Sequence, residues 1–344
     1  MSLGKAKILS QGAAGGIVGT DHFDTVLWTG NATTRTIPVN FQPDFVWIKA
    51  RTFSSSYGLY DSLRGAQKWM STAFTSANQD SPTALQSFTS AGFTLGTDSG
   101  QYGVNRSGVD YVAWNWYAPT SETNNNGNVT GTIKKNVDAG FSIVNYTATS
   151  GQTVGHGLDG APDLIIKKAL TVEDWLIYSS VAGTGKYMSF TRNEQGFGAG
   201  SDGAVSRSNS FNTVNSTVFS DNWTSASLNY IAYCFKNVAG YQKIGSYNGT
   251  GNAGIVVEVG FTPSFLLVKR MDSGGTSGAR GWFLLDNKRN TSNPRNTSLE
   301  AQAGYQDNTL SSISFDFDAT SFKVNGTNYQ VNQSGGSYLY LAIA

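Results

Sequence analysis

The chain contains little of the chemistry on which metal sites, disulfide frameworks and catalytic triads depend. Among 344 residues there is one cysteine, and there are two histidines. A single cysteine excludes an internal disulfide, and Cys234 lies in the strand-like segment YIAYCF, where we interpret it as an inert buried thiol. His22 and His156 have no HxH or HExxH spacing, so the sequence predicts neither a zinc site nor a histidine-based triad. For His156, in VGHGLDG, we predict a hydrogen bond within a glycine turn.

Charge is also scarce. Charged residues make up 14% of the chain, and 24 basic residues against 23 acidic ones leave a net charge of +1, well below the usual charged fraction of about a quarter. Beyond Lys134 and Lys135 there is no basic cluster, so we expect no nucleic-acid partner. No apolar run approaches the length of a membrane span, and the opening MSLGKAKILSQGAAGGIVGT is not a convincing signal peptide. We therefore expect no membrane insertion.

Glycine and aromatic residues take the place of charge. The chain has 40 Gly, 16 Tyr, 19 Phe and 8 Trp. Short runs of β-branched and aromatic residues alternate with turns rich in Gly, Asn and Ser, which is the pattern of strands joined by loops. The composition therefore predicts an all-β protein.

One pattern occurs three times along the chain. The segments FQPDFVWIKAR, GAPDLIIKKAL and FTPSFLLVKRM place Pro43, Pro162 and Pro263 before a strand-like stretch that runs to a lysine. An aromatic strand precedes each segment, a second strand follows it, and an aromatic strand closes each set: YVAWNWYA, YIAYCFKN and YLYLAIA. The separation of Pro43 from Tyr111 equals that of Pro162 from Tyr230. Chance would not keep so many landmarks in order.

We therefore predict three tandem antiparallel β-sandwich or jelly-roll-like repeats of about 100 residues, behind an extended N-terminal leader. We expect each repeat to form an independent sandwich, with the first two most alike. The expected boundaries are residues 1–20 for an extended N-terminal anchor, 21–118 for repeat 1, 119–140 for an exposed linker, 141–238 for repeat 2 and 239–344 for repeat 3.

Several patterns resemble catalytic or cofactor motifs. Asp316 and Asp318 could form the acid pair of a glycosidase, but we interpret them as a solvated strand face. GAGSDG, at 198–203, has the letters of a dinucleotide-binding loop without the helix that the mechanism needs, and we interpret it as a loop. The D-x-x-R pairs Asp61/Arg64 and Asp286/Arg289 are interpreted as ion pairs that close turns. We expect no catalytic residue, no cofactor and no metal ligand, and thus no enzyme.

Aromatic residues are the remaining candidates for binding. Those that recur in step are assigned to the framework: Trp28, Tyr146, Tyr247, Trp69 and Tyr187. Four loop aromatics have no counterpart, and aromatic faces suit sugar rings. We therefore predict Phe53, Tyr102, Phe197 and Tyr305 as candidate glycan contacts.

The combination of DHFDTVLWTGN, PDFVWIK, YDSLRG, FTSAGFTLG and YVAWNW, followed by GFSIVNYTATSGQTVGHGLDGAPDLIIKK, carries a resemblance. It resembles a repeated β-domain found in tail-fibre and other structural proteins of tailed bacteriophages, notably phages of marine and cyanobacterial hosts. These are framework motifs, so the resemblance implies a virion component, assembled in the host cytoplasm, and no reaction.

The expected function is a tail-fibre, spike or external decoration subunit of a virion. In the leader, Ile8, Leu9, Ile17 and Val18 are the apolar residues that we predict to anchor it. The expected partners are other virion proteins and further copies of this chain, as a homotrimer by analogy with phage fibres. Two alternatives stay open: a glycan-binding adhesion module that contacts the host surface, and a polysaccharide depolymerase.

Overall fold

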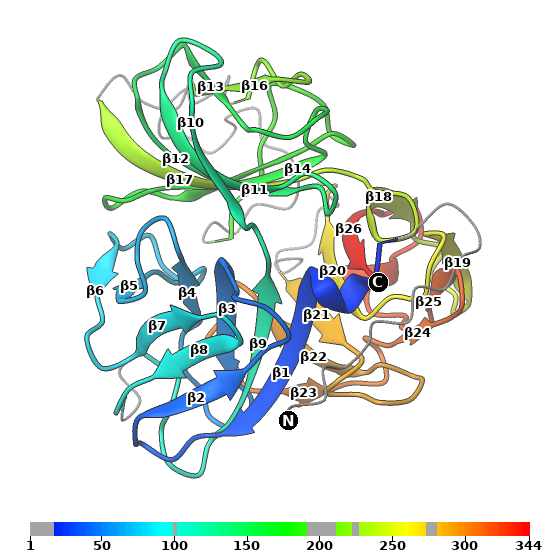
Figure 1. Cartoon of the computed structure of the whole chain (residues 1–344). Helices are drawn as coiled ribbons and strands as arrows, with labels where there is room; N and C mark the ends of the chain where they lie inside the picture. The colour runs from blue at the N-terminus through cyan, green and yellow to red at the C-terminus, as the bar shows by residue number, and fades with distance from the viewer. Residues whose placement is uncertain (1–16, 99–101, 191–210, 222–226, 273–280) are drawn as a thin grey trace, which may run out of the picture.

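The computed structural model shown in Figure 1 describes residues 17–98, 102–190, 211–221, 227–272 and 281–344. Strands account for 47% of the chain and helices for 2%. The helical elements are the 3-10 turn η1 (Gly19–Asp21) and α1 (Tyr329–Asn332). In the described residues no helix has the length and apolar character needed to cross a membrane. The paired strands are antiparallel, so the predicted all-β antiparallel fold is confirmed.

The first sheet has the strand order β1-β9-β3-β4. A small sheet of order β2-β8-β7 packs on one of its faces, and β5 and β6 form a short pair. The strands are β1 (Phe23–Thr29), β2 (Arg35–Pro38), β3 (Phe45–Ala50), β4 (Gly58–Asp61), β5 (Lys68–Trp69), β6 (Gln79–Asp80), β7 (Leu85–Thr89), β8 (Gly92–Leu95) and β9 (Asp110–Trp116).

The second sheet has the order β10-β11-β12-β17-β14-β15, and the pair β13-β16 packs on it. Its strands are β10 (Thr120–Asn124), β11 (Gly131–Asn136), β12 (Phe141–Ala148), β13 (Gln152–Gly155), β14 (Leu164–Ala169), β15 (Trp175–Ser179), β16 (Val218–Asp221) and β17 (Leu228–Phe235). The prediction that residues 119–140 form an exposed linker was wrong in one respect. This region contains β10 and β11, whose main chains pair with each other and with β12, because its Thr- and Ile-containing segments suit a sheet edge.

The third sheet has the order β18-β26-β20-β21-β22-β23, with β19-β25-β24 packed on it. Its strands are β18 (Gln242–Asn248), β19 (Ile255–Glu258), β20 (Phe265–Arg270), β21 (Trp282–Asp286), β22 (Thr297–Glu300), β23 (Asn308–Thr309), β24 (Phe315–Phe317), β25 (Ser321–Val324) and β26 (Ser337–Ile343).

The three sheets share one arrangement of four strands. The orders β1-β9-β3-β4, β12-β17-β14-β15 and β18-β26-β20-β21 correspond strand by strand. Pro43, Pro162 and Pro263 each stand just ahead of the third strand in its order, where a residue without an N–H marks a strand entrance. The landmarks that the sequence places in step therefore lie on corresponding strands.

The largest hydrophobic cluster belongs to all three sheets at once. It includes Phe45 of the first sheet, Phe141 and Tyr233 of the second and Phe265 of the third. The rings of Phe45 and Tyr233 are stacked, with centroids 4.2 Å apart. The expectation of independent sandwiches was therefore wrong. Each large sheet is apolar on both faces, and the face away from its small sheet is buried in this shared core.

Buried lysines occupy equivalent positions in the three sheets. Lys49, Lys168 and Lys269 end the strand-like stretches that follow the three prolines, and each is at most 2% exposed. Burial disfavours a charged ammonium group. It lowers the pKa of Lys49 and of Lys269 to about 7 and that of Lys168 to about 8. The sequence pattern showed the lysines but not that they are buried.

Candidate functional site

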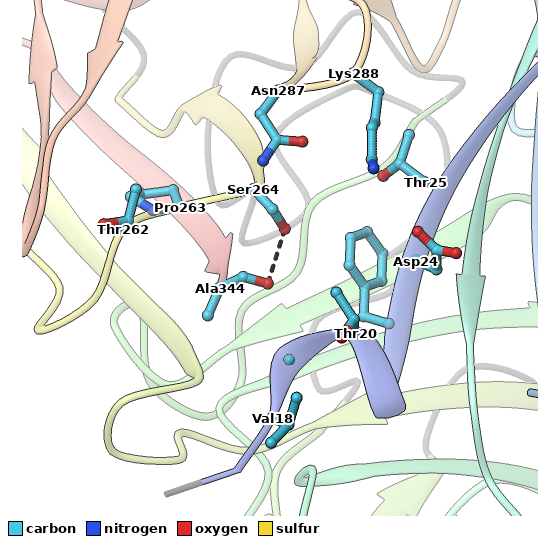
Figure 2. Close-up of a pocket in the computed structure, with 12 residues that line it drawn as sticks. Val18, Thr20, Asp24, Thr25, Thr262, Pro263, Ser264, Asn287, Lys288 and Ala344 are labelled. Atoms are coloured by element: carbon cyan, nitrogen blue, oxygen red, sulfur yellow. Dashed lines mark hydrogen bonds between the residues drawn. The ribbon is translucent and has the colours of Figure 1, made fainter. Parts of the chain in front are cut away.

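A cleft lies where the start of the first sheet meets the third sheet. We call it the seam cleft, and its volume is about 390 Å³, which falls within the usual size of ligand pockets. Figure 2 shows the residues that line it, which are Val18, Gly19, Thr20, Phe23, Asp24, Thr25, Thr262, Pro263, Ser264, Asn287, Lys288 and Ala344.

Close backbone contacts form one wall of the seam cleft. The Ser264 hydroxyl donates to the backbone oxygen of Ala344 at 2.8 Å, as Figure 2 shows. Gly19 lies so near that a Cβ there would come within 2.9 Å of the Ala344 oxygen. Glycine is therefore needed at residue 19 for the turn η1 to approach the third sheet.

The seam cleft contains one acidic and one basic side chain. Burial raises the pKa of Asp24, and the charge of Lys288 and the Thr25 N–H act against this shift. Among the described residues neither Asp24 nor Lys288 has an ion-pair partner within 4 Å. In Figure 2, Lys288 reaches across the cleft toward Thr25. The cleft thus offers both signs of charge to a bound group.

Two polar atoms beside these charges lack hydrogen-bond partners in the described part of the chain. They are Oγ1 of Thr25, a residue that is 5% exposed, and Oδ1 of Asn287. An unmade hydrogen bond at a buried polar atom costs about 1–3 kcal/mol. Both atoms therefore leave a hydrogen bond unmade at the wall of the seam cleft, within the described part of the chain.

A second hollow continues from the seam cleft along β1. We call it the edge groove; its volume is about 340 Å³, and Thr25 and Lys288 line both hollows. The remaining lining residues are Val26, Leu27, Trp28, Arg35, Ile37 and Pro38. Both hollows expose more apolar than polar surface, and the seam cleft also contains Asp24, Asn287 and the hydroxyls of Thr20, Thr262 and Ser264. Neither hollow could be predicted from the sequence, because each forms only where Lys288 comes against residues of β1 that are far from it in the chain.

The candidate anchor residues lie at the mouth of the seam cleft or outside the described residues. Ile8 and Leu9 lie outside them. Ile17 is half-buried and packs against the shared core, so it is part of the folded body. Val18 is 59% exposed and lines the cleft.

The candidate glycan contacts differ in how far their rings are exposed and in what they contact. Phe53 is half-buried under the Arg106 guanidinium, which lies 4.3 Å from the ring centroid. Tyr102 packs against Trp69 and donates from its hydroxyl to the Asp80 oxygen at 2.9 Å.

Tyr305 is 63% exposed and presents a free ring, and Phe197 lies outside the described residues. The loop of Tyr305 meets the loop that holds Phe53, because the Asp307 N–H donates to the Arg51 oxygen at 2.7 Å. The structure thus brings the loops of Phe53 and Tyr305 together.

The predicted D-x-x-R ion pairs are confirmed, and they are buried. Arg64 pairs with Asp61, and Nε of Arg289 lies 2.6 Å from Oδ2 of Asp286; all four side chains are at most 1% exposed. Each aspartate also accepts a hydrogen bond from another sheet. Asp61 accepts from the Tyr233 hydroxyl at 2.8 Å, and Asp286 accepts from the Nε1–H of Trp114 at 3.2 Å. Sequence reasoning missed that these pairs join sheets.

The remaining ionisable candidates have structural partners. His156 Nδ1 accepts from the Leu158 N–H at 3.1 Å, as the glycine-turn interpretation predicts, and burial lowers its pKa. Cys234 is fully buried, which raises the pKa of its thiol to about 12. Asp316 pairs with Lys323 at 2.7 Å. Partial burial acts to raise the pKa of Asp316, but the hydrogen bonds from Lys323 and Asn325 and the charges of Lys323 and Arg295 together lower it.

In the described part of the chain, no three His, Cys, Asp or Glu side chains gather as a metal site would require. The GAGSDG segment at 198–203 lies outside the described residues.

The chain matches the family described as Domain of unknown function (DUF7483) over residues 18–344, and it belongs to this family. A comparison with curated proteins found no match. The matched region comprises all three sheets and both hollows, and it begins at Val18, on the edge of the seam cleft.

Proposed function

We propose that this member of the DUF7483 family is a structural subunit of a tailed-bacteriophage particle. It would act as a tail-fibre, spike or external decoration subunit that is attached through residues 1–20. The observation that carries the proposal is that buried charged side chains join the three sheets. Asp61, Arg64, Asp286 and Arg289 are all engaged in fixing the three sheets to one another. A body braced in this way suits a rigid building block.

The seam cleft supports a binding or structural role over hydrolysis. Asp24 is the one acidic side chain among its lining residues, whereas glycoside hydrolysis needs two carboxylates across the scissile bond. The low charge of the chain, 14% of residues, also suits an external protein that packs against others.

Electron microscopy of particles tests the proposal. Gold-labelled antibody against this protein should decorate tailed particles released from cells that carry its gene. The protein would then be located in the virion after assembly in the host cytoplasm. Recovery of the protein only from the soluble lysate, with unlabelled particles, would reject the virion role.

We also infer that residues 21–118, 141–238 and 239–344 are tandem copies of one repeat. Besides the shared strand order, the same turn precedes β1, β12 and β18. The N–H groups of His22, Gly140 and Tyr241 each donate to the oxygen three residues earlier, at 3.0, 3.0 and 3.1 Å. An experimental structure in which the three turns failed to superimpose would contradict the inference.

Self-association is part of the same proposal, with a homotrimer as the assembly favoured by analogy with phage fibres. Analytical ultracentrifugation at micromolar concentration tests it. A mass of three chains would support the trimer, and a monomeric mass would reject it.

A second candidate function is glycan binding on the host surface. The exposed ring of Tyr305 favours it, because Tyr305 precedes Asp307 by two residues and Oδ2 of Asp307 lies 2.8 Å from Nε of Arg51. Tyr305→Ala should abolish binding to host polysaccharide, while the control Tyr329→Ala, at a residue 38% exposed, should retain it.

The depolymerase alternative is tested with the same polysaccharide. We expect no release of reducing ends above that of heat-inactivated protein. Release that Asp316→Asn or Asp318→Asn abolished would restore the depolymerase.

A further inference from the structure

The second sheet contains a strand that has no counterpart among the described strands of the first sheet. Strand β11 lies along the outer edge of β12. Its Ile133 is fully buried in the core between the second sheet and β13-β16, and its Lys134 reaches Asp44 of the first sheet at 2.6 Å. Strand β11 therefore fills a slot between two neighbouring sheets.

Strand β1 is the counterpart of β12. Phe23 pairs with Trp116 as Phe141 pairs with Phe235, each at the same end of its sheet. Ser264 is likewise the counterpart of Asp44, because their N–H groups donate to the closing strands at 2.7 and 2.8 Å. The space between β1 and Ser264 is thus equivalent to the space that β11 fills between β12 and Asp44.

That equivalent space is where the two hollows lie. The seam cleft separates β1 from Ser264, and the edge groove continues along β1 on the side of Trp28 and Ile37. No described strand pairs with the outer edge of β1, which begins its sheet. We call the two hollows together the open slot.

The open slot presents main-chain groups of β1 with which no described strand pairs. The His22 oxygen accepts from Tyr117, and the Gly30 N–H donates to Val109, so β1 turns alternate residues starting at 22 toward β9. Phe23, Thr25 and Leu27 therefore turn their N–H and C=O groups outward, into the open slot. An extended chain that adds to this edge would pair with them, and its side chains would enter the two hollows alternately.

The described course of the chain argues against the leader filling its own slot. In the second sheet Lys135 pairs with Ser142 and continues along β12. The corresponding Ile17 instead packs against the shared core. Figure 2 places Val18 at the opposite end of the seam cleft from Thr25 and Lys288. Ile17 and Val18 therefore do not run back along β1 as Lys135 runs along β12.

We propose that the open slot binds the leader, residues 1–16, of a second copy of this chain as an added strand on β1. The leader contains no proline, so its backbone can pair throughout. In the sequence KILSQ it has apolar residues next to Ser10 and Gln11. Alternation then places Leu9 in the edge groove, on the side of Trp28 and Ile37, and Ser10 in the seam cleft, beside Thr25, Asn287 and Lys288.

This inference deepens the proposed self-association, because it names the surface and the segment that join two copies. A strand that each copy donates to the next makes a head-to-tail contact, and such contacts close into a ring when the rotation between copies allows it. The leader's small residues Gly12 to Gly16 would cross from one body to the other.

Amide hydrogen exchange on the full-length protein tests the proposal, with a synthetic peptide of residues 1–16 as the probe. We expect exchange of the Thr25 and Leu27 amides to slow at least about tenfold as protein concentration rises, or when peptide is added to dilute protein. The amides of Asp24 and Val26, which face β9, are internal controls, as are those of Ile143 and Asn145, which β11 already covers. A peptide with Leu9→Asp should give no protection.

The outcomes separate the alternatives. Protection at every concentration, without added peptide, would show that the leader binds its own chain and would overturn the proposal. Fast exchange of Thr25 and Leu27 under all conditions would overturn it as well. Protection by peptide together with unlabelled particles would support the slot and reject only the virion role.

Discussion

The hydroxyl of Tyr233 donates a hydrogen bond to Oδ2 of Asp61 at 2.8 Å, across the boundary between the second and first sheets. The same carboxylate oxygen receives the guanidinium of Arg64. Tyr233 and Asp61 are both fully buried, and burial raises the pKa of the tyrosine well above its ordinary value. The phenol therefore stays protonated and acts as the donor, and a cation and a hydroxyl from two sheets share one anion.

Removing this hydroxyl should weaken the protein measurably. Tyr233→Phe leaves a buried carboxylate with one donor fewer, and we expect a loss of about 1–3 kcal/mol in the free energy of unfolding. Equilibrium unfolding in guanidinium chloride, followed by tryptophan fluorescence, gives this difference.

The matched control is Tyr57→Phe. Tyr57 is also fully buried in the shared core, but its hydroxyl has no hydrogen-bond partner among the described residues. Its replacement should change the free energy of unfolding by less than about 0.5 kcal/mol or increase it. Equal losses in the two variants would show that the bond to Asp61 has no special weight.

Arg289 and Arg51 bind the same carboxylate from different environments. Arg289 is fully buried and contacts both Asp286 and Asp307, while Arg51 pairs with Asp307 at a side-chain exposure of 22%. Arg289→Met should cost about 3–5 kcal/mol, because it leaves buried charge without a counterion. Arg51→Met should cost about 0–1 kcal/mol. Chemical denaturation of both variants checks the contrast, which a similar cost for the two would contradict.

The shared core predicts one cooperative unfolding transition for the described body. Phe93 is buried only in the core of the first sheet and its small partner, and Phe322 only in that of the third. Phe93→Ala and Phe322→Ala should each cost about 3–5 kcal/mol. In both variants, circular dichroism and fluorescence should give one coincident transition. A first sheet that melted separately in Phe93→Ala would restore the independent sandwiches.

The strand framework was predictable because it depends on local pattern. Pro43, Pro162 and Pro263 mark the entrances of corresponding strands, and the aromatic segments that close each set are β9, β17 and β26. Alternation and turn residues report on such features within a few positions.

The packing between sheets was not predictable from the same pattern. A strand that is apolar on both faces, such as β3, reads alike whether its second face meets a loop or another sheet. The open slot could not be predicted because it lies between β1 and Ser264, which are distant in the sequence and meet only in the folded chain. The linker was misjudged because Asn and Gly at 125–128 dominate its composition, although the segments on either side pair as β10 and β11.

The buried lysines predict a rise in stability with pH. Burial lowers the pKa of Lys49 to about 7, although the charge of Asp307 acts against the shift, whereas an unfolded lysine has a pKa of about 10.4. Between these values the unfolded chain binds a proton that the folded chain does not. The free energy of unfolding therefore increases with pH in this window, by up to about 1.4 kcal/mol per pH unit for one such group, and is flat below it.

Lys49→Met should remove this contribution. The variant keeps the length of the side chain and lacks the ammonium group that donates to the Ser55 oxygen. The stability difference between variant and parent should therefore shift in favour of the parent as pH rises from 7 to about 10. Urea denaturation at several pH values measures it, with Lys186→Met, at an exposed lysine, as the control whose difference from the parent stays constant. A constant difference for Lys49→Met as well would mean that Lys49 stays charged in the folded protein.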